Sequence, residues 1–293
     1  MTKSSLKSVL AVQPSDASTF IGESIPGIYN RTFGGQLIGQ AVASAGRTVA
    51  DDRQIVSAQT TFLHPGDYAQ PISYRVHTVR DGRTFSNRQV EAHQGGRIIF
   101  SGHFAFQVDE HLPGPTAAAE SERLTPLIQT KPPFVGPASA VGNDWNYRSY
   151  FDIRMTTVAD RPAGQLLTDD LPSVTTPEFA HQLAWFRLRE SAPAPGLLNR
   201  AMLGFASDYT VLRVVSQAKG VTRRESGVNG ATLSQSIWWH LEPSLDEWLL
   251  YVQETAKTPG IRGVVFGRIY TSSGILVASI AQEGFARAGD FDR

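Results

Sequence analysis

The side chains of this chain that could serve as nucleophiles carry oxygen or nitrogen, because its 293 residues include no cysteine. Disulfides and thiolate metal sites are excluded for the same reason. The seven histidines show no close pairing and no His-Glu-x-x-His pattern, and no Walker A or G-x-G-x-x-G loop occurs. We therefore expect neither a metal ion nor another cofactor.

The sequence also gives no support for a covalent mechanism with a serine nucleophile. The G-x-S-x-G elbow that presents the nucleophile of α/β-hydrolases is missing. A formal Ser-x-x-Lys match at Ser4 and Lys7 falls in a terminus that we expect to fray. Any catalytic oxygen or nitrogen must therefore be positioned by the elements of another fold.

Composition and charge restrict the partners. The 27 basic side chains balance 27 acidic ones, so the chain has no net field that would concentrate nucleic acid. No apolar run has the form of a signal peptide or the roughly 20 residues of a membrane span, and the C-terminal Gly-Asp-Phe-Asp-Arg is not a Ser-Lys-Leu signal. We expect a cytoplasmic protein that binds neither nucleic acid nor membrane.

The chain is long enough for two core-forming units, since single domains usually have roughly 100–200 residues. An offset of 178 residues aligns 60–74 with 238–252. The same offset aligns 95–106 with 273–284. Few of the aligned residues are identical, so chance similarity between strand-rich segments is the alternative to a duplication.

Each half predicts one helix followed by four strands, which is an α+β arrangement. Apolar spacing predicts helices over 33–50 and 197–215. Runs of β-branched and aromatic residues, bounded by Gly-containing turns, predict the strands. They lie near 55–64, 71–80, 84–94 and 97–107 in the first half and near 231–241, 247–257, 262–271 and 275–286 in the second.

Two such units can join edge to edge, which covers an exposed strand edge in each and makes one continuous antiparallel sheet. We expect a first unit over 1–110 and a second unit over 146–293. Between them, 111–145 is rich in Pro, Gly and Ala, as is typical of a linker.

Six motifs, spread over nearly the whole chain, are more specific together than singly. They are FGGQLIGQA (33–41), FLHPGD (62–67), VRDGRTFSNRQV (79–90), GFASDYTVL (204–212), ATLSQSIWWH (231–240) and LVASIAQEG (276–284). In this order they resemble the acyl-CoA thioesterase II, or TesB, family. The resemblance implies a tandem, or double, hotdog fold, in which each long helix is wrapped by a curved antiparallel sheet. It also implies hydrolysis of fatty acyl-CoA to a free fatty acid and coenzyme A.

The same resemblance implies three catalytic residues that hold the hydrolytic water, namely Asp208, Thr232 and Gln282. Where family members usually have an Asp-His pair, this chain has Ser234-Gln235. We expect that pair to contribute polarity to the substrate pocket, so the departure affects specificity or rate more than the type of reaction.

The chemistry of a thioester suits these roles. Its hydrolysis needs an activated water and a stabilised oxyanion, whereas the thiolate leaves readily near neutral pH. Asp208, flanked by Phe205 and Tyr209, would lose solvation and gain basicity, while Thr232 and Gln282 can orient one water. For each of the three, an ordinary helix or strand position is the alternative.

Strand alternation gives further information on Gln282, which shares the apolar face with Ile280 and so needs buried partners. Under the offset of 178 residues, Phe104 corresponds to Gln282 and Gln54 to Thr232. The first helix also has no acidic residue before its end. We therefore expect one catalytic centre per chain.

Two further groups are candidates for binding substrate. Gly34-Gly35-Gln36 opens the first helix, where free N–H groups can polarise a carbonyl, and close helix packing is the alternative. Arg80, Arg83 and Arg88 surround a strand turn and carry the charge that the phosphates of coenzyme A require. The alternative is that these arginines are simply exposed to solvent, which is common for arginines near a turn.

We expect an acyl-CoA thioesterase that uses base-activated water, forms no covalent acyl-enzyme and assembles as a homodimer or higher homo-oligomer. Two alternatives stay open. One is a hotdog hydratase or dehydratase of enoyl thioesters, for which a histidine near the helix is missing. The other is a non-catalytic acyl-thioester binding protein.

Overall fold

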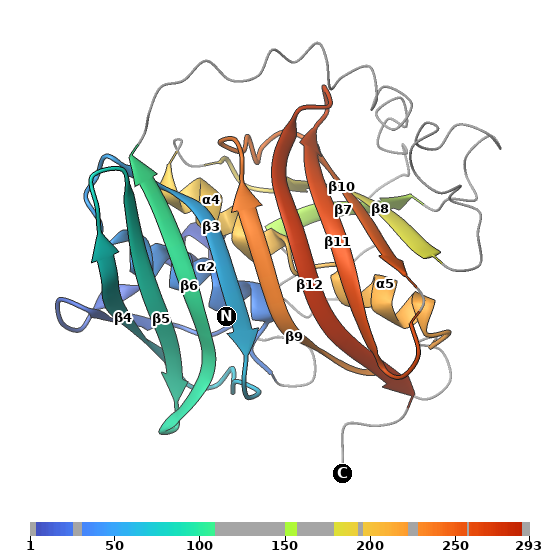
Figure 1. Cartoon of the computed structure of the whole chain (residues 1–293), viewed down its shortest axis with the longest axis horizontal. Helices are drawn as coiled ribbons and strands as arrows, with labels where there is room; N and C mark the ends of the chain where they lie inside the picture. Colours follow the sequence, from blue (N-terminus) through green and yellow to red (C-terminus); the bar gives the residue numbers. More distant parts are fainter. Residues whose placement is uncertain are drawn as a thin grey trace.

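The fold is a curved antiparallel sheet wrapped around two central helices, as Figure 1 shows for the computed structural model. The structure describes residues 4–25, 31–108, 150–156, 179–192, 196–221, 228–256 and 258–288. None of the helices in these ranges is long and apolar enough to span a membrane.

The first half contains the elements that its sequence pattern predicts, preceded by a short addition. The addition consists of α1 (Leu6–Leu10), β1 (Gln13–Pro14) and β2 (Thr19–Gly22). The predicted elements are α2 (Gly34–Gly46), β3 (Arg53–Phe62), β4 (Ile72–Asp81), β5 (Phe85–Gln94) and β6 (Arg97–Val108).

The second half repeats this order and adds two strands before its helices. The elements are β7 (Phe151–Thr156), β8 (Phe179–Leu188), α4 (Leu197–Ala206), α5 (Val211–Ala218), β9 (Val228–Trp239), β10 (Leu249–Ala256), β11 (Arg262–Thr271) and β12 (Leu276–Ala288). The four strands predicted from 231 onwards are β9 to β12.

The single helix predicted over 197–215 is wrong, because α4 ends at Ala206 and α5 begins only at Val211. Residues 207–210 form the turn between them. Its short polar side chains bond locally, as Ser207 Oγ does to the carbonyl of Gly204 at 2.8 Å. Such bonds compete with the helical ladder, although the apolar spacing continues across the break.

The sequence pattern does not predict β7 and β8, because β8 is buried on both faces and so lacks alternation. Its residues 183–186 form a continuous apolar run. Ala184 and Phe186 join the main core, whereas Leu183 and Trp185 belong to a second cluster with Leu250. A short run of this kind does not distinguish a strand from a buried helix.

The two halves join edge to edge, as expected. The sheet has 12 strands in the order β1-β2-β4-β5-β6-β3-β9-β12-β11-β10-β8-β7. Its centre is the antiparallel pair of β3 and β9, in which Ser57 lies opposite Trp238 and Thr61 opposite Ser234. The predicted linker lies within residues outside the described ranges, and the domain boundaries stay a prediction.

Matching β-bulges support the duplication. Ile99 of β6 and Val277 of β12 are each the extra residue of a bulge, and they lie 178 positions apart. Val56 of β3 and Leu233 of β9 are likewise extra residues, but they lie 177 positions apart. The offset read from the sequence therefore holds for the β6 and β12 pair and is wrong by one for β3 and β9.

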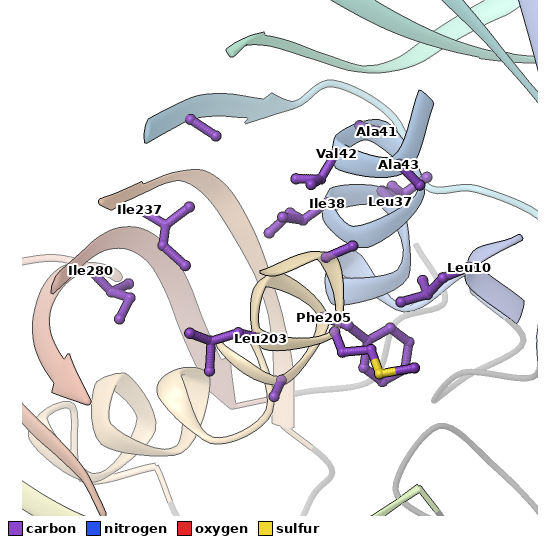
Figure 2. Packing of buried hydrophobic residues seen from close by; sticks show 14 of the residues in the cluster. Leu10, Leu37, Ile38, Ala41, Val42, Ala43, Leu203, Phe205, Ile237 and Ile280 are labelled. Carbon is purple, nitrogen blue, oxygen red and sulfur yellow. The ribbon is translucent and has the colours of Figure 1, made fainter. Parts of the chain in front are cut away.

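The core lies between the two helices and the concave face of the sheet (Figure 2). Ile38 of α2 and Leu203 of α4 meet there with Ile237 and Ile280 from the sheet. Gly35 lets the helices approach closely, because a Cβ there would lie 2.2 Å from the carbonyl oxygen of Phe205. This approach brings the start of α2 to the end of α4.

Candidate active site

Asp208 lies in the turn between α4 and α5, and its side chain is almost completely buried. Only 8% of the residue is exposed. The backbone N–H of Ser207 still donates to Leu203, so the last turn of α4 carries the acid to its position. A carboxylate placed here is surrounded by core rather than solvent.

Thr232 and Gln282 both contact this carboxylate. The Thr232 hydroxyl donates to Asp208 Oδ1 at 3.0 Å, and Gln282 Nε2 donates to the same oxygen at 2.9 Å. Gln282 Nε2 also lies 2.8 Å from Thr232 Oγ1. The three side chains predicted to converge therefore touch one another directly.

A β-bulge makes this contact possible. Gln282 pairs with Gln235 across β12 and β9, and both face the core. In a regular strand, Thr232, three residues before Gln235, would face the opposite side of the sheet. The extra residue Leu233 restores the inward direction, so Thr232 pairs with Gly284 and reaches the acid.

Burial and hydrogen bonding act in opposite directions on Asp208. Loss of solvation raises its pKa from 3.8 to about 6, while hydrogen bonds from Thr232, Gln282 and the backbone N–H of Gly35 oppose the rise. An acid with a pKa of about 6 is ionised near neutral pH and is more basic than an exposed aspartate. These are the properties of a general base.

The start of α2 closes the other side of the acid. A Cβ at Gly34 would lie 2.6 Å from Asp208 Oδ2 and 3.0 Å from the Phe62 ring. Phe33, the residue before α2, stacks on Tyr209 with ring centroids 5.2 Å apart. The first half of the chain therefore supplies a helix N-terminus and aromatic side chains to an acid from the second half.

Of the other residues predicted near this site, Gln36 and Ser234 do not contact Asp208, whereas Gln235 binds the residue next to it. Gln36 is occupied in the fold, since its amide binds the backbone of Glu23 and Ile25. Ser234 lies on the face of β9 opposite to Gln235, so it does not join the Asp208 cluster. Gln235 faces the core, where its Nε2 donates to Ser207 Oγ at 2.6 Å.

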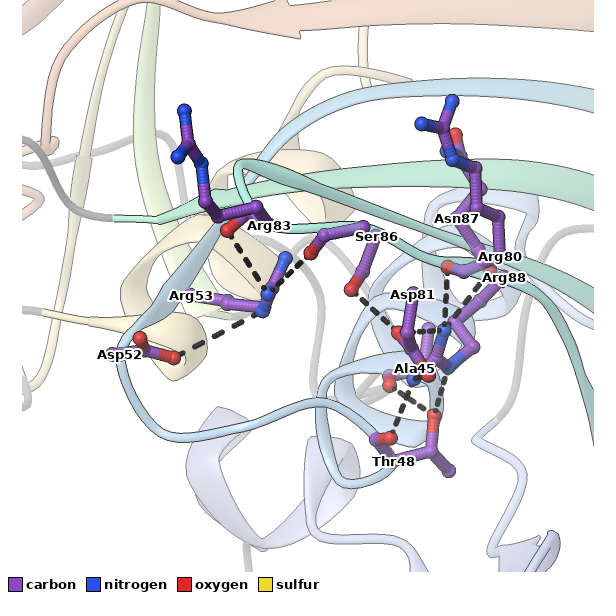
Figure 3. A network of polar contacts seen from close by, with 11 residues as sticks. Ala45, Thr48, Asp52, Arg53, Arg80, Asp81, Arg83, Ser86, Asn87 and Arg88 are labelled. Carbon is purple, nitrogen blue, oxygen red and sulfur yellow. Dashed lines mark hydrogen bonds and ion pairs between the residues drawn. The ribbon is translucent and has the colours of Figure 1, made fainter.

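The prediction that Arg88 binds a phosphate conflicts with its position (Figure 3). The side chain is only 2% exposed, forms an ion pair with Asp81 at 2.9 Å and donates to the hydroxyl and carbonyl of Thr48. Arg80 and Arg83 are exposed on the same hairpin. Thr48 follows the end of α2, about 20 Å from Gly34 at 1.5 Å per helical residue.

The described part of the first half does not repeat the arrangement of Asp208, Thr232 and Gln282. The matching bulges make Ile55, rather than Gln54, the counterpart of Thr232, and Phe104 the counterpart of Gln282. Both counterparts are apolar and buried, and α2 contains no acidic residue. In the described ranges, no three His, Asp or Glu side chains gather as a metal site would require.

Sequence reasoning missed Ser207 and Tyr251, and it named Gln235 only as a residue that contributes polarity to the substrate pocket. Ser207 receives the amide of Gln235 and, at its carbonyl oxygen, the hydroxyl of Tyr251. The sequence offers one signal for them, a polar residue at 235 two positions before Ile237, which is apolar and buried on the same face of the strand.

Comparison with known proteins gives matches over both halves. Residues 23–107 match the model of the acyl-CoA thioesterase N-terminal domain, and residues 172–285 match the acyl-CoA thioesterase model. Acyl-CoA thioesterase 2 of Haemophilus influenzae is 28% identical over 290 residues, covering 95% of this chain and 96% of its own. Acyl-coenzyme A thioesterase 8 of Mus musculus is also 28% identical, with coverage of 96% and 88%.

Solved structures agree with these matches. The acyl-CoA thioesterase II TesB2 from Mycobacterium marinum superimposes with a TM-score of 0.73 at 28% identity, covering 98% of this chain and 99% of its own. A protein with a hot dog fold from Alicyclobacillus acidocaldarius has a TM-score of 0.67 at 16% identity, covering 99% and 100%. The double hotdog fold expected from the sequence is therefore confirmed.

Proposed function

The chain belongs to the acyl-CoA thioesterase II, or TesB, family, and from that premise we propose that it hydrolyses fatty acyl-CoA with a water activated by Asp208. This assignment of roles rests on one observation. The buried carboxylate of Asp208 lies beside the start of α2 and accepts hydrogen bonds from Thr232 and Gln282.

The proposed reaction needs one base and no covalent intermediate. Asp208 accepts a proton from the water while the water oxygen bonds to the thioester carbonyl carbon, giving a tetrahedral oxyanion. When that species collapses, the carbon–sulfur bond breaks, and the thiolate of coenzyme A leaves with the electron pair. The proton held by Asp208 then neutralises the thiolate, and the acyl group departs as the free acid.

Thr232 and Gln282 orient the reacting groups. Both donate to Oδ1 of Asp208, which leaves Oδ2 on the side facing Gly34. Gln282 Oε1 is buried and has no hydrogen-bond partner among the described residues, so it is available to accept an O–H of the water. An oriented water loses less entropy on reaching the transition state.

The N-terminus of α2 suits the developing negative charge. A helix N-terminus has unpaired N–H groups and a partial positive charge. Phe33 at the N-cap provides no side-chain acceptor, and the first turn carries no acid. Because the Gly35 N–H already bonds the Asp208 carboxylate, we assign the partial positive charge at the start of α2, rather than that N–H group, to stabilisation of the oxyanion.

Release of free thiol from acyl-CoA tests the function. We expect steady turnover by the wild type, a loss of at least roughly 100-fold in kcat for Asp208→Asn, and losses of about 10-fold or more for Thr232→Val and Gln282→Met. Thr61→Val, on the outward face of β3, is the control and should retain full activity. Near-normal turnover by Asp208→Asn would place the base elsewhere.

The same assay separates the alternatives. Binding of acyl-CoA without thiol release would indicate a binding protein. Loss of the enoyl absorbance of an enoyl-CoA without thiol release would indicate a hydratase. The cytoplasmic location and the homo-oligomeric state stay predictions, to be checked by cell fractionation and by light scattering.

A further inference from the structure

The turn that carries Asp208 is held by buried side chains from several strands. Gln235 Nε2 of β9 lies 2.6 Å from Ser207 Oγ, and the Tyr251 hydroxyl of β10 donates to the carbonyl of Ser207 at 3.1 Å. Ser207 is completely buried, Gln235 is 1% exposed and Tyr251 is 2% exposed. The residue immediately before the acid is therefore tied to the sheet at two atoms.

The far end of the same turn is tied as well. Gln253 Nε2 donates to the Thr210 hydroxyl at 2.6 Å, and Gln182 Nε2 donates to the Thr210 carbonyl at 3.2 Å. Gln182 and Gln253 lie directly opposite each other on β8 and β10. Asp208 therefore lies between two residues, Ser207 and Thr210, that are each hydrogen-bonded to strands of the sheet.

Gln235 is an unfavourable choice for stability alone. Burying an amide without satisfying all its hydrogen-bonding capacity destabilises a fold. Gln235 Oε1 is buried and has no hydrogen-bond partner among the described residues, so the Nε2 bond to Ser207 is what the side chain provides. The adjacent inward position on the strand, Ile237, is apolar and fully buried.

We propose that Gln235 is a positioning residue, which acts through Ser207 to hold Asp208 within reach of Thr232 and Gln282. This inference rests on the proposed function. It replaces the expectation that Gln235 lines the substrate pocket. A displacement of about 1 Å can reduce a rate 100-fold when reacting groups must align, so one buried hydrogen bond can affect turnover strongly.

Four variants test the inference. Gln235→Met removes the donor with little change of shape, Ser207→Ala removes its acceptor, and the double variant removes both. Gln94→Met is the matched control, since Gln94 is also a buried strand amide but binds Asp67 and Gln70 in the first half. All are assayed for kcat and KM, and the Asp208 carboxyl is titrated by NMR without substrate.

We expect Gln235→Met and Ser207→Ala each to lower kcat about 10-fold with KM within about twofold, and the double variant to lose about 10-fold rather than 100-fold. The titration midpoint of Asp208 should rise in both, because the acid loses its donors. Gln94→Met should keep kcat and the midpoint of the wild type, although it loses stability.

A wild-type kcat and midpoint in Gln235→Met would overturn the inference, as would additive losses in the double variant. If Gln235→Met fails to fold, Ser207→Ala decides the question, and a normal kcat there overturns it. A wild type that releases no thiol, with midpoints that still move in both variants, would refute the proposed function and leave the positioning role standing.

Discussion

Gln282 Nε2 lies 2.9 Å from Asp208 Oδ1, although 74 residues separate the two in sequence. Thr232 donates to the same oxygen, so both donors act on one side of the carboxylate. The other oxygen, Oδ2, faces the start of α2 at Gly34. The acid therefore has one oxygen held by the sheet and one directed towards the helix of the other half.

The pKa of Asp208 predicts how activity depends on pH. Because burial raises that pKa to about 6, the base is protonated and inactive in mildly acidic solution. We expect kcat/KM to rise with pH through about 6 and then to level off. Measurement of initial rates across this range checks it, with the residual activity of Asp208→Asn as the reference. A rate that is constant through this range would contradict the role of Asp208.

The free energy of unfolding should fall with rising pH, whereas kcat/KM rises. The folded-state pKa of Asp208 lies above its ordinary value of 3.8, so the free energy of unfolding falls as pH rises from 3.8 to about 6 and then levels off. Asp208→Asn removes that penalty, which amounts to at most about 3 kcal/mol at ~1.4 kcal/mol per pH unit. We expect the variant to melt above the wild type near pH 8, with the difference shrinking towards pH 4. Thermal unfolding at both pH values checks this, and an equal difference at both would count against it.

Gly34→Ala should impair catalysis without unfolding the protein. The added Cβ would lie 2.6 Å from Asp208 Oδ2, which must move, whereas Gly34 has no positive φ that alanine would strain. We expect kcat to fall about 10-fold or more, with a Tm near that of the wild type.

The control for this variant is Gly39→Ala. Its Cβ would lie 2.8 Å from Leu10 and 3.0 Å from the carbonyl of Ala201, away from the acid. It should lower the Tm while kcat is maintained. Equal kcat for the two variants would mean that Gly34 matters only for packing.

Arg88 should prove to be a structural residue. Arg88→Met leaves the hydroxyl and carbonyl of Thr48 without their buried donor and removes the ion pair with Asp81, whose side chain is 54% exposed. We expect it to lower the free energy of unfolding by about 2 kcal/mol. Arg83→Ala removes an exposed side chain and should leave the Tm unchanged. Urea unfolding measures the first effect, and KM for acyl-CoA should stay unchanged in both. A rise in KM would restore the phosphate-binding role for this hairpin.

The local sequence pattern alone determined where most strands of this protein lie and which way some of their side chains face. The strands β9 to β12 appear where β-branched and aromatic runs predict them, because strand formation follows residue type and period. The inward direction of Gln282 also follows from alternation, and it is confirmed by burial beside Ile280. Resemblance to a family then supplied the three residues whose contact the structure confirms.

Tertiary structure decided the rest, because bulges, turns and ion pairs depend on residues far apart in sequence. The bulge at Leu233 turns Thr232 inward, and the local sequence pattern of β9 does not predict this bulge. Polar bonding at Ser207 interrupts a helix whose apolar spacing continues. Arg88 is buried because Thr48 and Asp81 fold against it, whereas its sequence neighbourhood resembles an exposed turn. Periodicity reports which face of an element is apolar, but only the packed chain determines which polar groups meet there.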